Sequence, residues 1–187
     1  MERNLYPLKF YPVLKSKIWG GKKIQQFLNK ECGSIEKCGE SWEISGVQGD
    51  ISVVKNGFLA GNNLQELIEV YMGDLVGDEV FEKFGLEFPL LIKFIDASDD
   101  LSIQVHPDNE TAKKRHNAYG KTETWYILQA DKGASIITGF KKDTSKEEFL
   151  DKLENNQLKD ILNSETVSKG DVFFIPSGRL HSIGRGV

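Results

Sequence analysis

The stretch that decides the fold is Gly170-Asp171-Val172-Phe173-Phe174-Ile175-Pro176-Ser177-Gly178-Arg179-Leu180-His181. Its first two residues predict a turn, and the apolar run that follows predicts a buried strand, which Pro176 ends. Gly178 lets the backbone bend after that strand, so that His181 re-enters the interior of the fold. A histidine delivered inward by such a bend is a candidate metal ligand.

Short strand-like runs dominate the rest of the chain. Each is rich in β-branched or aromatic residues and is bounded by Gly, Asp, Asn or Pro. They cover residues 8–11, 41–45, 51–54, 90–96, 101–106, 122–128, 135–138 and 172–175. The pattern predicts a mainly β protein, because the even βαβ alternation of a doubly wound sheet is absent from the sequence.

A helical insert is expected at about residues 61–85. Asn63 precedes Glu66 by three positions, which is capping-box spacing, and apolar residues then recur on one helical face.

A second helix is expected to open at Ser145, which precedes Glu148 by three positions. Its apolar residues, from Phe149 to Leu153, are expected to pack inward. Residues 160–162 are expected to add a further helical turn.

Composition excludes several classes of protein. A chain of 187 residues that is 39% hydrophobic and 28% charged suits one soluble globular domain. The net charge is −4 and the lysines are scattered among acids, so a nucleic-acid partner is not expected. No run resembles a signal peptide or a membrane span, so a cytoplasmic protein without a membrane partner is expected. Cys32 and Cys38 lack partners for a four-cysteine zinc site and are expected to be reduced thiols.

The segment 101–106 carries polar residues at alternate positions. Side chains alternate between the two faces of a strand, so Ser102, Gln104 and His106 would share one face. A half-buried strand with an ordinary solvent face gives the same pattern.

A third segment reads Lys121-Thr122-Glu123-Thr124-Trp125-Tyr126, with Lys121, Glu123 and Trp125 on one face. A carboxylate beside a lysine can bind a metal next to a cation that steadies negative charge. A surface ion pair would look the same in the sequence.

These segments together offer two imidazoles, one carboxylate and one amide oxygen. This mixed nitrogen and oxygen set suits a borderline ion such as zinc. The third histidine, His116, lies in a polar helical stretch after Asn109 and is expected to be solvated.

The run from Gly170 to His181 resembles the second motif of the cupin superfamily, which is a glycine, five residues, Pro-x-Gly, two residues and a histidine. In place of the first cupin motif the chain has Gln104-x-His106-Pro107 and a later Lys121-x-Glu123, and this is what type I phosphomannose isomerases of the short bacterial branch look like. The stretches 39–45 and 88–93 also resemble that family.

The resemblance implies a cupin-type β-barrel or jelly roll with helical insertions, formed by residues 1–187 as a single catalytic region. Family members carry an arginine on a strand well beyond the second metal histidine. The resemblance therefore implies a chain truncated at its C-terminus.

The resemblance also implies a function, that of a mannose-6-phosphate isomerase. Such an enzyme interconverts mannose 6-phosphate and fructose 6-phosphate by moving a proton between C2 and C1 through an enediol-like intermediate. By motif position Zn²⁺ is held by Gln104, His106, Glu123 and His181. Lys121 is the catalytic residue, as an acid/base or as an electrostatic aid, and Ser102 and Lys93 hold the phosphate.

Two alternatives stay open. One is a non-catalytic cupin that binds a sugar phosphate. The other is an iron-dependent cupin oxygenase, which is disfavoured because such sites use a set richer in histidine.

Overall fold

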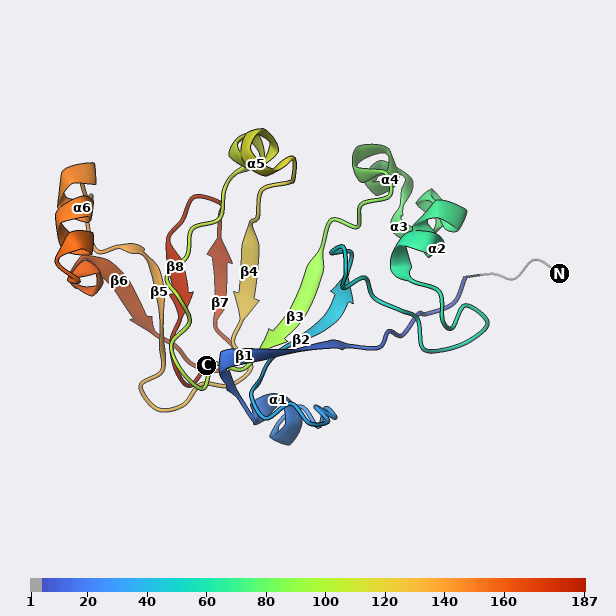
Figure 1. The fold of residues 1–187 in the computed structure, drawn as a ribbon, viewed down its shortest axis with the longest axis horizontal. Helices are drawn as coiled ribbons and strands as arrows, with labels where there is room; N and C mark the ends of the chain where they lie inside the picture. Colours follow the sequence, from blue (N-terminus) through green and yellow to red (C-terminus); the bar gives the residue numbers. More distant parts are fainter. Residues whose placement is uncertain (1–4) are drawn as a thin grey trace. The chain divides into compact units, whose positions relative to one another are not determined.

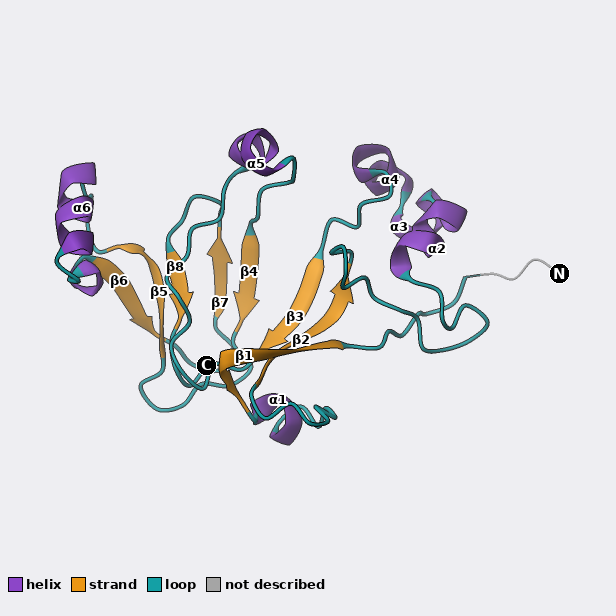
Figure 2. Ribbon diagram, viewed as in Figure 1, coloured by secondary structure: helices purple, strands orange, loops and turns teal. Residues whose placement is uncertain are grey.

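The computed structural model describes residues 5–187, which form strands joined by short helices (Figures 1 and 2). They divide into two compact units, an N-terminal unit that ends at Ile95 and a C-terminal unit that begins at Asp96. All the paired strands are antiparallel, and none of the sheets formed by the described residues closes on itself. The expectation of a mainly β fold is confirmed. A single catalytic region over residues 1–187 stays a prediction.

The N-terminal unit is built on a three-stranded sheet in the order β1-β2-β3. The strands are β1 (Val13–Gly21), β2 (Cys38–Ser45) and β3 (Leu91–Ile95), and the short helix α1 (Lys23–Gln26) connects β1 to β2. The expected strand at residues 8–11 is wrong, since only Phe10 makes a bridge there, to Val54. The long strand β1 was missed because its lysines interrupt the apolar pattern.

Three helices lie between β2 and β3, in the segment where the capping-box spacing predicts an insert. They are α2 (Leu64–Tyr71), α3 (Gly73–Val76) and α4 (Asp78–Phe84). The capping box is present at the start of α2: Glu66 N donates to Asn63 Oδ1 at 3.0 Å, and Asn63 N donates to Glu66 Oε2 at 2.8 Å. The face of α2 that carries Leu67 and Ile68 is buried.

The C-terminal unit contains two sheets. One pairs β4 (Glu123–Tyr126) with β7 (Val172–Ile175), and the other has the order β6-β5-β8. Its strands are β5 (Ser135–Phe140), β6 (Leu162–Thr166) and β8 (His181–Ile183), and its helices are α5 (Asn109–His116) and α6 (Lys146–Glu154). A buried cluster of Ile127, Ala134, Ile136 and Val167 forms the core of this unit.

Three expectations for this unit need correction. Residues 160–162 are not a helical turn: a 3₁₀ helix ends at Asp160 and β6 begins at Leu162, which is buried and pairs with Phe140 of β5. Residues 101–106 form no strand, because their ladder pairing is limited to one isolated bridge, from Gln104 to His181. The apolar residues of helix α6 do not pack inward, because none of them is buried; the ring of Phe149 lies 6.1 Å from that of Phe140.

No helix among residues 5–187 combines the length and the apolar character that crossing a membrane requires. Cys32 and Cys38 are both buried and no disulfide joins them, as the sequence led us to expect.

A buried carboxylate joins the three strands of the N-terminal sheet. Glu40 of β2 is only 5% exposed. Its Oε1 accepts a hydrogen bond from Lys93 Nζ of β3 at 2.8 Å, and its Oε2 lies 3.4 Å from Lys17 Nζ of β1 and accepts from Trp42 Nε1 at 3.0 Å. Burial opposes ionisation of this carboxyl, but the lysines and the indole outweigh it, so the pKa of Glu40 lies below its ordinary value.

We predict that Glu40→Gln lowers the free energy of unfolding by about 2 kcal/mol at neutral pH, because the amide leaves two ammonium groups without a counter-charge. The pKa of Glu40 is lowered in the folded state, so this stabilisation is present above the ordinary value of 4.5 and is lost as the pH falls through the folded-state pKa. Urea unfolding of both proteins at a series of pH values measures the difference. Glu36→Gln, at an exposed position, is the matched control.

Candidate metal centre

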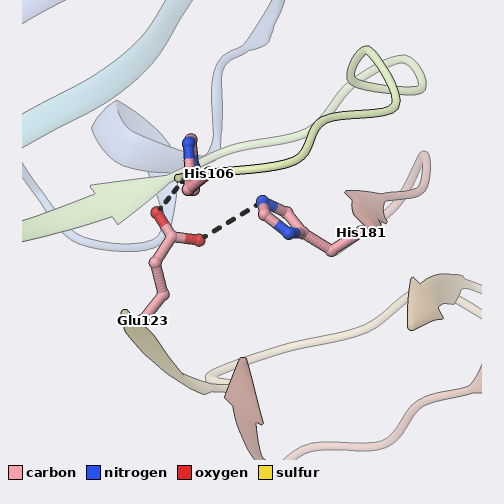
Figure 3. A group of neighbouring side chains, drawn as sticks. All are labelled: His106, Glu123 and His181. Atoms are coloured by element: carbon pink, nitrogen blue, oxygen red, sulfur yellow. Dashed lines mark ion pairs between the residues drawn. The ribbon is translucent and has the colours of Figure 1, made fainter. Parts of the chain in front are cut away.

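Three potential metal ligands converge in the C-terminal unit. They are His106, Glu123 and His181, and one ligand atom from each lies within 4.8 Å of the others. His106 follows the bridge at Gln104, Glu123 opens β4 and His181 opens β8. Figure 3 shows the carboxylate of Glu123 between the two imidazoles.

Backbone hydrogen bonds hold the two histidine segments together. Gln104 N donates to His181 O and His181 N donates to Gln104 O, both at 2.9 Å. Gly178 N donates to His106 O at 2.8 Å, and Gly178 has a φ of 83°, which a side chain would strain. The bend that the sequence predicts before His181 is therefore present, and it brings His181 beside His106.

The carboxylate of Glu123 is fixed by its own strand. Glu123 pairs with Ile175 of β7, and Trp125, two residues further along β4, donates from Nε1 to Glu123 Oε2 at 3.1 Å. Lys121 Nζ lies 3.0 Å from Glu123 Oε1. The indole of Trp125 also meets the ring of His181 edge-on, with centroids 5.5 Å apart.

The environment keeps Glu123 ionised. Burial opposes its charge, but the charge and hydrogen bond of Lys121, the nearby His106 and the indole of Trp125 outweigh burial, so the pKa of Glu123 lies below its ordinary value. A carboxylate is the form that binds a metal ion.

Each imidazole lies at a distance from the Glu123 carboxylate that is close to the separation of two donors on one ion. Glu123 Oε1 lies 3.5 Å from His106 Nε2, and Glu123 Oε2 lies 3.7 Å from His181 Nε2. Metal–ligand bonds of about 2.1 Å in a tetrahedron place neighbouring donors about 3.4 Å apart. His181 Nδ1 lies 2.8 Å from Arg179 O, and a proton on Nδ1 would be donated there, which leaves Nε2 as a metal donor. The residues therefore fit a divalent metal ion.

The other predicted site residues are placed as follows. Gln104 adjoins His181 through its backbone, and its side-chain Nε2 donates to Ser102 Oγ at 3.2 Å; its role as a fourth ligand stays a prediction. Lys121 borders the cluster and is 45% exposed. Lys93 lies in the N-terminal unit and is paired with Glu40. The assignment of Lys93 and Ser102 to phosphate stays a prediction.

His116 lies outside the site, as the sequence predicts, whereas two contacts of the site were not predicted. His116 is exposed at the last position of α5 and outside the cluster. The hydrogen bond from Trp125 to the Glu123 carboxylate was missed, although their two-residue spacing on one strand face was visible. The contact to the carbonyl of Arg179 has no sequence signal, because every residue carries that group.

Known proteins are similar to this chain over nearly all of it. A family model described as the catalytic domain of type I phosphomannose isomerase matches residues 7–145. Mannose-6-phosphate isomerase ManA of Bacillus subtilis is 40% identical over 185 residues, which are 97% of this chain and 55% of that protein. A mannose-6-phosphate isomerase of Streptococcus mutans is 40% identical over 181 residues, with the same two coverages of 97% and 55%.

A solved structure gives the same result. The crystal structure of the mannose 6-phosphate isomerase from Bacillus subtilis superposes with a TM-score of 0.86 at 36% identity, and covers 96% of this chain and 55% of that one. This match confirms the cupin-type fold expected from the sequence. The chain spans about half the length of the curated relatives it matches, 55% for the two above.

We predict that zinc raises the melting temperature of the protein, because an ion that binds the folded state at about 100 times its Kd stabilises it by about 2.7 kcal/mol. Glu123→Gln should abolish the rise, since the amide brings no charge between the two imidazoles. His116→Ala should keep it and controls for adventitious binding to a histidine. An equal zinc response in Glu123→Gln and the wild type would exclude this cluster as the metal centre.

Proposed function

Because the chain belongs to the type I phosphomannose isomerase family, we propose that it carries the metal centre of a mannose-6-phosphate isomerase, an aldose–ketose isomerase. The proposed reaction interconverts mannose 6-phosphate and fructose 6-phosphate. The observation that supports it most is the convergence of His106, Glu123 and His181 with the ammonium of Lys121 against the same carboxylate.

We propose zinc as the metal, held by His106, Glu123 and His181, with the amide oxygen of Gln104 as the fourth ligand. Imidazole and carboxylate donors suit this borderline ion. When bound, zinc supplies Lewis-acid stabilisation of the negative charge that develops on the sugar oxygens as the proton leaves C2. The low pKa of Glu123 keeps this ligand ionised without the metal.

Lys121 is proposed as the catalytic residue. Its ammonium lies 3.0 Å from Glu123 Oε1 and its side chain is 45% exposed, so it borders the centre and can be reached from solvent. A lysine in this place can exchange a proton with the substrate or hold a positive charge against a developing oxyanion. An arginine at the same position separates the two roles, because it keeps the charge and does not release its proton.

Ser102 and Lys93 are proposed to bind the phosphate. Ser102 Oγ accepts from Gln104 Nε2, which leaves its hydroxyl hydrogen to donate to an anion. An ammonium has three donors, and the contact of Lys93 Nζ with Glu40 at 2.8 Å uses one of them. A hydroxyl donor and a point charge are the groups that a phosphate recognises.

The isomerase proposal predicts turnover that depends on the metal. Mannose 6-phosphate is supplied to the protein in an assay coupled to the formation of fructose 6-phosphate. We expect turnover that a chelator stops and added zinc restores. Zinc and mannose 6-phosphate bound tightly without turnover would contradict the enzyme and support a non-catalytic sugar-phosphate-binding cupin.

Two variants should separate chemistry from phosphate binding. Lys121→Gln should lower kcat by about 100-fold or more at saturating zinc, because it removes the proposed acid/base or cation. Ser102→Ala should raise KM by about 10-fold, the value of one charge-assisted hydrogen bond, with kcat nearly unchanged. Lys132→Gln, at an exposed position, is the control for the loss of a lysine. An unchanged kcat in Lys121→Gln would refute the catalytic assignment.

A further inference from the structure

The segment from Pro107 to Lys121 connects two of the candidate metal ligands, His106 and Glu123. It starts next to His106, forms α5 and ends two residues before Glu123 (Figure 1). Its two ends meet, because Lys121 N donates to Pro107 O at 3.1 Å. The separation of His106 from Glu123 therefore depends on how this segment closes at its base.

A side chain takes part in this closure. Gly120 N donates to Asn109 Oδ1 at 2.9 Å. A Cβ at Gly120 would lie 2.5 Å from the carbonyl carbon of Asp108, 2.6 Å from Asn109 N and 2.8 Å from Pro107 O. These are backbone atoms that cannot swing aside, so the close approach of the two ends requires glycine at position 120.

Asn109 is not needed to start the helix that it opens. The cap of α5 is Asp108, whose Oδ1 accepts from Thr111 N at 2.7 Å. Alanine has a higher helix propensity than asparagine, so Asn109→Ala does not weaken α5. Its side chain can therefore be removed without melting the segment, and the hydrogen bond to Gly120 is what is lost.

Several other links between ligand segments run through the backbone. Gln104 and His181 are joined by two main-chain hydrogen bonds, and Gly178 N donates to His106 O. These links fix one histidine against the other. The closure at Asn109 and Gly120 adds a direct link between the segment that carries Lys121 and Glu123 and the segment that carries His106, besides the pairing of β4 with β7.

We propose that Asn109 and Gly120 are positioning residues that close the base of this segment and set the separation of His106 and Glu123 for metal binding. The inference rests on the metal centre of the proposed function. It assigns the pair no contact with the metal or the substrate. Removing a group that orients a metal ligand typically lowers metal affinity by about 10- to 100-fold. We expect a loss of about 10-fold for Asn109→Ala.

The test measures metal affinity directly. Zinc is titrated into the protein in competition with a chromophoric chelator, and Co²⁺ is added separately so that its absorption spectrum reports the ligand geometry. We expect Asn109→Ala to weaken zinc binding by about 10-fold and to alter the Co²⁺ spectrum. Asn109→Asp retains an acceptor oxygen and should restore both to within about 3-fold of the wild type. Gly120→Ala should weaken binding at least as much as Asn109→Ala.

A matched control keeps the result specific. Lys113→Ala changes an exposed residue on the same helix and should leave affinity and spectrum unchanged. Wild-type affinity and an unchanged Co²⁺ spectrum in Asn109→Ala would overturn the inference. If Gly120→Ala does not fold, the comparison of Asn109→Ala with Asn109→Asp decides the question alone.

The two proposals fail in different ways. Zinc binding that depends on Asn109, in a protein that makes no fructose 6-phosphate, supports the positioning role and refutes the isomerase. Turnover with zinc affinity indifferent to Asn109 refutes the positioning role and leaves the isomerase standing.

Discussion

The pair of main-chain hydrogen bonds between Gln104 and His181 is the constraint on which the metal centre depends. It joins segments that lie far apart in the sequence, and closing such a loop costs entropy that a single bridge does not offset. Two neighbouring hydrogen bonds help to offset this entropic cost: Leu101 N donates to Ile183 O and Ser182 Oγ donates to Leu101 O. With these segments joined, His106 and His181 lie with their ring centroids 4.9 Å apart, and Glu123 of β4 completes the set.

Electrostatics prepares this centre before any cation arrives. A carboxylate between two imidazoles, partly out of water, would tend to take up a proton. The ammonium of Lys121 and the indole N–H of Trp125 oppose that tendency, and the pKa of Glu123 is lowered as a result. Lys121, which helps to keep Glu123 ionised, is also the proposed catalytic residue. Its positive charge therefore lies at the edge of the metal site. Donors fixed in this way need little reorganisation when charge develops nearby.

The sequence predicted the parts of the structure that local patterns control. The motif before His181 predicted its inward bend, and alternation along one strand placed Lys121 on the same face as Glu123. It did not predict parts that distant partners decide. Strand β1 is interrupted by lysines, one of which meets the Glu40 carboxylate from another strand, and Leu162 belongs to β6 because Phe140 lies opposite. The backbone links of the metal centre left no trace in the sequence, since any residue can make them.

We expect one divalent metal ion to be held between His106, Glu123 and His181. Crystals grown with zinc and measured on both sides of the zinc absorption edge would locate it. We predict an anomalous peak at about 2.1 Å from His106 Nε2, His181 Nε2 and a carboxylate oxygen of Glu123. A zinc-loaded crystal with no peak among these three side chains, or with its peak at Cys32 and Cys38 instead, would contradict it.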